Sequence, residues 1–530
     1  MIVLLALLSC GPVDLQEAPP APTMLDGPRL ARRLSLELRG TLPTVEELDA
    51  AAASEDGWRT LRDAWLEDPR LEDRLVELLG QRWHTRVDTF DIEAFDYGLD
   101  PIEEYRFERS VGEEPLRLMA YVATQDLPWP EIVTADYTRA NDLLADIWPL
   151  SYPADAEGWQ VARYTDGRPA AGVLATNGLW WRYNTNESNM NRARAAAISR
   201  LLLCEDFLAR PVSFASDDRS LSGDPELAVR TDPYCLACHA SIDPLAASMF
   251  GFWWLSLYSV VEETAYHPER EPLAEEVLGT SPAWFGEPIA GLADLGVHVA
   301  NDSRFLTCTV SSTAELLWQR PVTLADQGTL DALTATFVDE GWRMKPLLAA
   351  ITETEAYRAG DAWDLAEARG VRMLTPGQLA SALEDLTGFR WVQEGYDQLD
   401  NDTLGFRVLA GGVDGVSVLR PADQPGLTWA LVARRAAQGA AVHAVTHKLP
   451  LAPDPQGLFR HVDPGSRAGD PAFDDELRDL HWRLYAEPAE DAWLAAVREL
   501  WLAVEAVEGP QGAWTATLSA LLRDPRFLTR

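Results

Sequence analysis

Residues 68–83 read Asp-Pro-Arg-Leu-Glu-Asp-Arg-Leu-Val-Glu-Leu-Leu-Gly-Gln-Arg-Trp, and this stretch decides the fold class. Asp68 is a strong N-cap residue, and Pro69 suits the first turn of a helix, where its missing N–H costs nothing. The apolar residues that follow recur at helical spacing: Leu71, Leu75, Leu78, Leu79 and Trp83. The stretch therefore predicts an amphipathic helix.

The same helix signals recur along the chain. Leucines four residues apart run up to Gly40, and capping boxes open further helices after Thr44 and Thr375. We therefore expect a mainly α fold, built as multidomain helical bundles with a loop-rich Cys-x-x-Cys-His module and few short strands. Two of those strands are predicted at 173–176 and 179–181.

A short signature occurs three times, as Asp68-Pro-Arg-Leu, Asp302-Ser-Arg-Phe and Asp524-Pro-Arg-Phe. Each copy places an N-cap residue before a docking apolar residue. Three unrelated helix starts and an ancient duplication both explain the pattern, and the sequence leaves both open.

The composition excludes several classes of protein. With 530 residues and a formal charge of −38, the surface repels phosphate backbones and anionic lipids, which argues against nucleic-acid binding and electrostatic membrane docking. An apolar content of 47% with 24% charged residues excludes general disorder. Twenty tryptophans indicate either many small cores or flat ligand-binding surfaces.

The first ten residues, Met-Ile-Val-Leu-Leu-Ala-Leu-Leu-Ser-Cys, predict a lipoprotein signal peptide that ends at Cys10. Leu-Leu-Ser before Cys10 resembles the bacterial lipobox, in which the cysteine is lipidated. Residues 11–28 are rich in proline and predict an extended tether. We expect an exported protein that a lipid anchors in the bacterial cell envelope, in the periplasm or on the outer surface. A frayed apolar terminus with a buried cysteine is the alternative.

The remaining chain divides into four predicted domains. They are an N-terminal helical domain, a haem-type module with the Cys-x-x-Cys-His motif, a helical module and a C-terminal helical domain, at 29–150, 151–290, 291–365 and 366–530.

Cys235-Leu-Ala-Cys238-His239 is the strongest chemical signal. Cys-x-x-Cys-His is the attachment pattern of c-type haem. Two thiols three positions apart can each bond one vinyl group of the porphyrin, and the adjacent imidazole then ligates the iron. Asp243 and Pro244 are expected to shape the loop that leaves the motif. The sequence thus predicts one covalent haem c held by these three side chains.

Two other readings of the motif stay open. Cys235 and Cys238 can form a redox-active or structural disulfide. A zinc site needs a fourth ligand, and the chain has no second Cys-x-x-Cys pair. The motif does not determine the second axial ligand of a haem. Met249 is a candidate, although its spacing also fits a residue of the hydrophobic core. His267 and His298 are expected to be solvated or packed.

The cysteine count leaves Cys204 and Cys308 once lipid and haem are assigned. In an oxidising compartment, an even remainder suggests that these two form a disulfide. Two buried free thiols are the alternative.

Residues 131–360 resemble multidomain exported cytochrome-like bacterial families of unknown function, which occur with planctomycete-type cytochrome c domains. The resemblance is strongest where Cys235-Leu-Ala-Cys-His239 is followed by Ile-Asp243-Pro-Leu245, and it extends to Glu131 through Ala145 and to Asp302 through Cys308. The chain departs from the families after Leu245 and at Asn191-Arg-Ala-Arg194. The resemblance implies export and haem, but it implies no substrate.

These observations predict a lipid-anchored, c-type cytochrome-like protein that relays electrons to an unknown redox or envelope partner. No catalytic residue is assigned, because no hydrolase motif is present. The alternative is a non-catalytic surface scaffold that binds carbohydrate or protein through tryptophan-rich faces, with the Cys-x-x-Cys pair as a structural disulfide. Exposure of Trp180, Trp181 and Trp253 on one patch would favour the scaffold.

Overall fold

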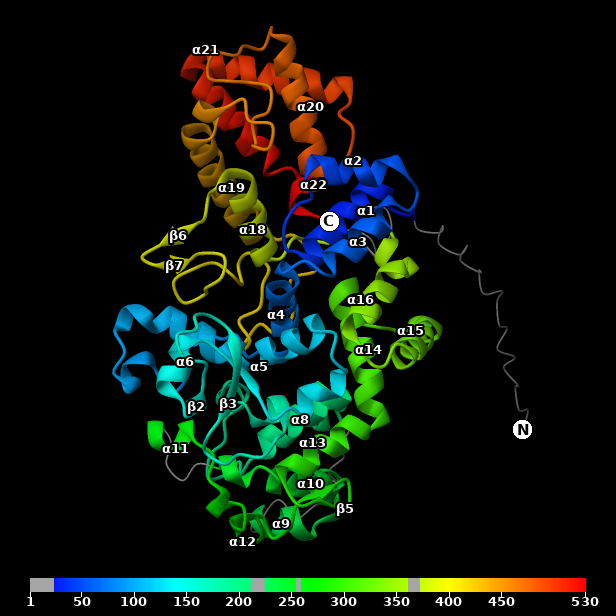
Figure 1. The fold of residues 1–530 in the computed structure, drawn as a ribbon, viewed down its shortest axis with the longest axis vertical. Coiled ribbons are helices and arrows are strands. Elements are labelled where there is room, and N and C mark those ends of the chain that lie inside the picture. The colour runs from blue at the N-terminus through cyan, green and yellow to red at the C-terminus, as the bar shows by residue number, and fades with distance from the viewer. Residues whose placement is uncertain (1–22, 211–224, 254–258, 361–371) are drawn as a thin grey trace, which may run out of the picture.

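The computed structural model describes residues 23–210, 225–253, 259–360 and 372–530, and within them the chain is mainly α-helical (Figure 1). It contains 22 α-helices in these ranges. Strands contribute only a three-stranded antiparallel sheet and two hairpins. The expectation of a mainly α fold with few short strands is confirmed.

The elements before the Cys-x-x-Cys-His motif form the blue and cyan parts of Figure 1. Their helices are α1 (Gly27–Leu38), α2 (Val45–Ala53), α3 (Gly57–Trp65), α4 (Arg70–Trp83), α5 (Glu104–Thr124), α6 (Asp142–Ile147), α7 (Asn177–Arg182) and α8 (Arg192–Leu203). Their strands are β1 (Thr138–Ala140), β2 (Leu150–Ser151) and β3 (Gln160–Tyr164). The central strand β3 pairs antiparallel with both neighbours, with Arg139 opposite Val161 and Ser151 opposite Arg163.

The green elements of Figure 1 contain the motif and the segment after it. They are α9 (Pro225–Thr231), α10 (Pro233–Ala247), α11 (Val260–Thr264), α12 (Leu273–Leu278), the hairpin of β4 (Ala283–Trp284) and β5 (Glu287–Pro288), α13 (Leu292–Asn301), α14 (Ser303–Trp318), α15 (Gln327–Asp339), α16 (Met344–Glu353) and α17 (Glu355–Arg358).

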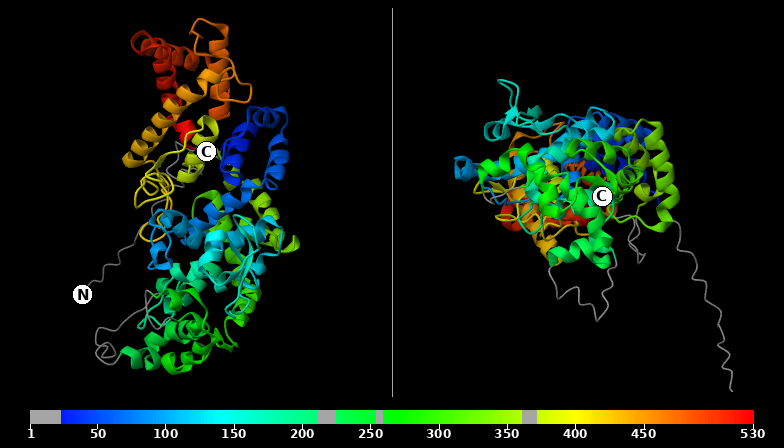
Figure 2. Two further views of the ribbon diagram at one scale, coloured as in Figure 1. Left: turned by 60° about the vertical axis from the view of Figure 1, so that its left-hand side comes forward. Right: turned by 90° about the horizontal axis from the view of Figure 1, so that it is seen from below.

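The C-terminal part forms a lobe at one end of the molecule, coloured yellow to red in Figure 2. Its elements are α18 (Pro376–Thr387), the hairpin of β6 (Val392–Gln393) and β7 (Tyr396–Asp397), α19 (Leu427–His447), α20 (Pro471–Tyr485), α21 (Asp491–Leu521) and α22 (Pro525–Leu528). Helix α21 is kinked at Gly509, whose φ of 74° is left-handed and precedes Pro510.

Two predicted strands are wrong. Residues 172–175 form a short 3₁₀ helix, and residues 177–182 form α7. Both segments are buried on all sides, with Leu174 and Trp180 at most 1% exposed. A short continuous apolar run fits a buried helix as well as a buried strand, so its pattern could not separate the two.

The hydrophobic cores cross the predicted domain boundaries. One core takes buried residues from Leu30 to Tyr357, so the segments 29–150, 151–290 and 291–365 share it. A second core takes residues from 374 to 528 together with Leu36 and Leu42. A third, smaller core surrounds Trp181. Helix α1 thus contributes one face to the first core and Leu36 to the second.

The end of the predicted tether is docked on the folded body. Met24 forms an isolated β-bridge with Ala359. The Leu25 N–H donates to the Arg358 carbonyl at 3.0 Å, and the Gly360 N–H donates to the Thr23 carbonyl. Residues 23–26 are therefore a pairing segment that leads into α1 and not part of a tether, because backbone hydrogen bonds fix them. The remainder of the predicted tether, 11–22, lies outside the described residues.

The repeated Asp-x-Arg signature is a local clamp. At Asp68, Asp302 and Asp524 the carboxylate accepts hydrogen bonds from the backbone N–H and the guanidinium of the arginine two residues later. Asp166 and Arg168 make the same clamp at a bend. Because the clamp also occurs outside a helix start, it indicates shared local chemistry and does not by itself indicate duplication.

A buried cluster of charges joins the two large cores. Glu37 on α1 is fully buried and forms ion pairs with Arg74 of α4 and with Arg530, the last residue of the chain. Burial lowers the pKa of Arg530 to about 10, so the guanidinium stays charged at neutral pH. Arg74 also pairs with Glu77, whereas the ion pair of Arg530 within the described residues is with Glu37.

We predict that Glu37→Gln destabilises the protein by about 3 to 5 kcal/mol, because it leaves the buried guanidinium of Arg530 without its carboxylate partner. Chemical denaturation followed by circular dichroism measures the effect. Glu55→Gln, which changes an exposed glutamate near the end of α2, is the control and should leave the unfolding midpoint in place. Equal midpoints for the two variants would contradict the prediction.

Candidate functional site

The Cys-x-x-Cys-His motif occupies the first turns of α10. Asp232 caps this helix by accepting a hydrogen bond from the Tyr234 N–H at 2.8 Å, and Pro233 takes the first helical position. Residues three and four apart on a helix share one face. Cys235, Cys238 and His239 therefore project from the same side of α10.

The ring of His239 is oriented by a carboxylate. Its Nδ1 lies 2.9 Å from Oδ1 of Asp243, one helical turn further along α10. Arg192, the first residue of α8, binds both oxygens of the same carboxylate at 2.7 and 3.0 Å. Burial opposes ionisation of Asp243, but these two hydrogen-bond donors outweigh it and hold the pKa of Asp243 below its ordinary value.

The ionised carboxylate of Asp243 fixes the tautomer of the His239 ring. An ionised carboxylate only accepts hydrogen bonds, so the proton must sit on Nδ1 of His239. The other ring nitrogen, Nε2, then carries the lone pair of the neutral ring. Metal-binding histidines are commonly oriented by a carboxylate in this way.

The expectation that Asp243 and Pro244 shape a loop is wrong. Helix α10 continues through both residues to Ala247. Pro244 lies inside the helix, and Asp243 is 5% exposed and turned toward His239 and Arg192. The segment is helical because the apolar residues from Ile242 to Ala247 pack into the first core.

The motif is half-buried, not enclosed. Cys235, Cys238 and His239 all have intermediate exposure, and Cys238 packs against the first core. Cys235 and Cys238 are not joined by a disulfide. Across the described ranges, no group of three or more His, Cys, Asp or Glu side chains is arranged to hold a metal ion, so the structure adds no fourth ligand to the motif.

The other residues considered as ligands lie in separate environments. Met249 is fully buried in the first core, which is what the core-packing interpretation predicts. Nδ1 of His267 lies 3.0 Å from Glu269, and the ring of His298 packs near Trp284. Neither the core position of Met249 nor these two contacts brings a second ligand to His239.

Cys204 and Cys308, the pair expected from the cysteine count, are joined in a disulfide between α8 and α14. Cys10 and the predicted signal peptide lie outside the described residues. In the part of the chain that the structure describes, no helix has both the length and the apolar character needed to cross a bilayer.

The tryptophans in the described ranges are buried or partly buried. Trp180, Trp181 and Trp253 are 1%, 7% and 8% exposed, and none of the tryptophans in the described ranges is among the exposed residues. Trp181 is surrounded by the rings of Phe90, Tyr97, Phe107 and Trp148. Stacking on a sugar needs an exposed ring, so this burial weighs against the tryptophan-rich scaffold.

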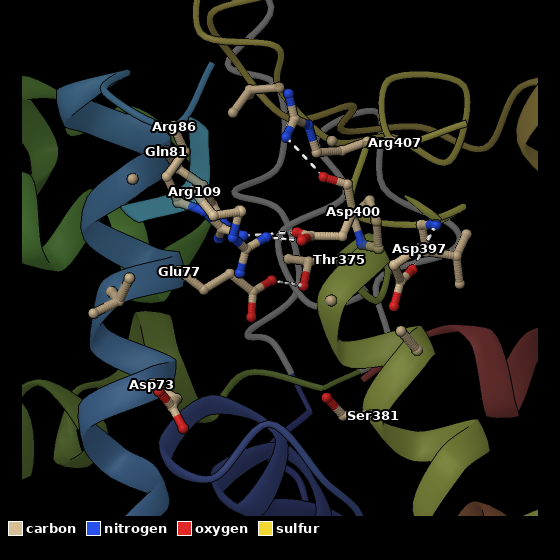
Figure 3. A pocket seen from close by; sticks show the side chains of 18 of the residues that line it. Asp73, Glu77, Gln81, Arg86, Arg109, Thr375, Ser381, Asp397, Asp400 and Arg407 are labelled. Carbon is tan, nitrogen blue, oxygen red and sulfur yellow. Dashed lines mark hydrogen bonds and ion pairs between the residues drawn. The ribbon is translucent and has the colours of Figure 1, made fainter. Parts of the chain in front are cut away.

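A cavity of about 390 Å³ lies between the two large cores (Figure 3). Its walls come from α4, α5, the start of α18 and the segment from 390 to 421. The glycine-rich turn at 411–415 forms part of the wall, and Asp414 stabilises it by accepting hydrogen bonds from the N–H groups of Val416, Ser417 and Val418. This stretch is a turn.

Charges line the cavity but neutralise one another. Glu113 of α5 forms ion pairs with Arg86, Arg109 and Arg117, and Asp400 from the opposite wall binds the first two of these arginines. Burial alone would raise the pKa of Glu113, but the three guanidinium groups lower it to about 2. These three arginines are therefore all ion-paired, and the pairs to Asp400 link α5 to the opposite wall.

Sequence reasoning missed the partners of the motif. Asp243 follows His239 by four residues, so a helical reading of the whole segment would have paired them. Arg192 comes from a distant helix and leaves no local signal. The cavity does leave a sequence signal, because Arg109, Glu113 and Arg117 are spaced four residues apart and so share one face of α5.

Comparison with known proteins adds no assignment, since no protein family, no curated protein and no solved structure matches the chain. The functional reading therefore depends on the motif, its partners and the disulfide.

Glu108, on α5 near the cavity, gives a pH-dependent prediction. Burial, with the nearby charges of Asp88 and Glu104, raises its pKa to about 8. The folded state keeps a proton that the unfolded state loses, so this group's contribution to stability is lost as the pH rises from about 5 to about 8, by at most about 1.4 kcal/mol per pH unit.

Glu108→Gln, which mimics the protonated carboxyl, should therefore be more stable than the parent at pH 8 and equally stable near pH 4.5. Urea unfolding at a series of pH values measures the difference. Glu499→Gln, an exposed change on α21, is the control and should track the parent at every pH. A constant difference between Glu108→Gln and the parent would refute the raised pKa.

Proposed function

We propose that this chain is an exported, lipid-anchored protein of the bacterial cell envelope that carries one covalent haem c on α10 and relays electrons. Cys235 and Cys238 would hold the porphyrin through thioether bonds, and Nε2 of His239 would ligate the iron. The haem would supply one-electron chemistry, as it does in c-type cytochromes generally.

The observation that carries the proposal is the hydrogen bond between His239 and Asp243. It leaves Nε2 as the nitrogen with the free lone pair, on the same helix face as both thiols. The half-exposed position of all three side chains also favours a cofactor that covers this face from outside. The residues present therefore fit a haem c.

The chain's own residues have distinct tasks in this proposal. Asp243 holds the proton at Nδ1 of His239 and makes the imidazole more basic. Arg192 keeps Asp243 ionised and fixes the position of its carboxylate. Arg194, fully buried and two residues further along, donates to the carbonyls of Tyr183 and Phe252 and so anchors the start of α8.

The compartment is supported by the disulfide between Cys204 and Cys308. Disulfides persist in oxidising compartments such as the bacterial periplasm and are rare in the cytosol. Haem attachment to Cys-x-x-Cys-His also takes place outside the cytoplasm. The lipobox at Cys10 supplies the proposed anchor.

Intact-mass measurement of the mature protein, purified from envelopes of a host that attaches haem c, tests the proposal. We expect a mass gain of one haem, an absorption spectrum of c-type haem and an acyl modification on Cys10. Cys235→Ala combined with Cys238→Ala should abolish covalent haem, whereas Cys204→Ala combined with Cys308→Ala should retain it. A colourless parent protein would end the proposal.

The role of Asp243 gives a second prediction. Asp243→Asn keeps the side-chain shape but removes the anionic acceptor, so His239 becomes a weaker ligand. Exogenous imidazole should then displace His239 about 10- to 100-fold more readily, and the midpoint potential should rise, because a less basic ligand stabilises ferric iron less. Optical titration and redox titration measure the two effects.

Glu269→Gln is the matched control, since it removes the acidic partner of another histidine, His267. It should leave both measurements unchanged. If Asp243→Asn behaves like Glu269→Gln, the carboxylate does not act on the iron ligand.

A further inference from the structure

The disulfide between α8 and α14 has one accessible end and one buried end. Cys204 is the C-cap of α8, has a left-handed φ of 55° and is exposed. Cys308 lies in the second turn of α14 and is 2% exposed. A reagent from solution can therefore reach Cys204 but not Cys308.

Arg82 of α4 contacts both sulfur atoms. Its Nη2 lies 3.1 Å from Sγ of Cys204 and 3.2 Å from Sγ of Cys308. The same nitrogen lies 3.3 Å from each of the backbone carbonyls of Arg200 and Leu201, in the last turn of α8. The guanidinium group is thus held directly over the S–S bond.

Arg82 has no anionic partner in the described residues. It forms no ion pair there with a carboxylate within 4.0 Å, although the chain has 83 acidic residues. Burial lowers the pKa of Arg82, the nearby charge of Arg200 adds to that effect, and Glu315 opposes both. A half-buried cation without a counter-ion is costly, and a neutral disulfide cannot compensate its charge.

We propose that Cys204–Cys308 is a redox-active disulfide that exchanges with an external dithiol, with Arg82 stabilising the thiolate that reduction creates. Reduction replaces the neutral sulfur pair beside Arg82 with an anion and so gives the guanidinium the partner it lacks. Stabilising the reduced form makes a disulfide easier to reduce than a purely structural one.

The positions of the two sulfur atoms assign their roles. A thiolate of the dithiol attacks Sγ of the exposed residue Cys204. The S–S bond breaks, and its electron pair leaves on Sγ of Cys308 as a thiolate beside Arg82. The second thiol of the dithiol gives its proton to solvent, attacks the mixed disulfide and releases Cys204. The dithiol is thereby oxidised to its disulfide, and two electrons pass to the protein.

The positions of the two cysteines in their helices support attack on Cys204 with Cys308 as the leaving group. Cys204 follows the last turn of α8, where the helix dipole disfavours an anion. Cys308 has no such disadvantage and has Arg82 at 3.2 Å. The buried sulfur is therefore the better leaving group, because a stabilised thiolate leaves faster. This proposal does not depend on haem at α10.

Equilibration of the full-length protein in dithiothreitol buffers of graded potential tests the proposal, with alkylation and mass spectrometry to count free thiols. We expect Arg82→Gln to disfavour reduction at least tenfold, a shift of about 30 mV to more negative potential. Arg82→Lys keeps the charge and should retain most of the parent's potential. Arg70→Gln, on the same helix but bonded to Asp68, should match the parent.

Three results would overturn the proposal. One is an equilibrium constant in Arg82→Gln equal to that of the parent, and another is an Arg82→Lys variant that behaves like Arg82→Gln. The third is a native disulfide that dithiothreitol does not reduce until the protein unfolds. Brief treatment with glutathione followed by peptide mapping tests the order of attack, and the mixed disulfide is expected on Cys204. An adduct on Cys308 would contradict the assigned roles.

Discussion

The two large cores meet at the ion cluster around Glu37, and the rest of the architecture depends on it. Helix α1 carries this carboxylate together with Arg32 and Arg33, all of them buried. Arg32 donates hydrogen bonds to the carbonyls of Leu484, Phe527 and Thr529 in the C-terminal lobe. Arg33 donates to those of Tyr357 and Ala359 at the end of residues 23–360, which we call the first body; the C-terminal lobe is the second. Helix α1 thus donates hydrogen bonds to the C-terminal segments of both bodies. Because its charges are buried, the loss of a partner would leave a charge uncompensated and destabilise the fold.

The two bodies close in the same way. Before α1, Met24 pairs with Ala359, which follows α17; before α18, Met373 pairs with Thr529, which follows α22. In each case a short extended segment leads into a helix and is held by backbone bonds to the end of the same body. Arg372 then reaches across to the carbonyls of Leu317 and Ala356 in the first body. Both bodies thus share this pairing of the segment before the first helix with the segment after the last, in addition to the Asp-x-Arg clamps at Asp302 and Asp524.

Local chemistry in the sequence predicts the helices well but predicts their assembly poorly. The capping boxes at Thr44 and Thr375 and the stop at Gly388 are present because the groups that satisfy these helix ends lie within a few residues. The helical nature of 177–182 and the continuation of α10 past Pro244 depend instead on burial, which one sequence does not display. The sequence supplies the three motif residues, but Arg192 and Arg82 come from other helices. Only the fold brings Arg192 to the carboxylate of Asp243 and Arg82 to the sulfur atoms of the disulfide.

The disulfide sets the smallest useful recombinant piece of this protein. Cys204 falls in the predicted module 151–290, Cys308 in the module 291–365, and the arginine over their bond in the segment 29–150. A truncation between residues 290 and 291 would separate the two cysteines and invite intermolecular crosslinking, and one between 150 and 151 would remove Arg82 from their bond. Either cut would expose part of the shared core. Expression trials on the motif-bearing half should therefore keep residues 23–360 together, and they need the C-terminal lobe as well if Glu37 and Arg32 are to keep their partners.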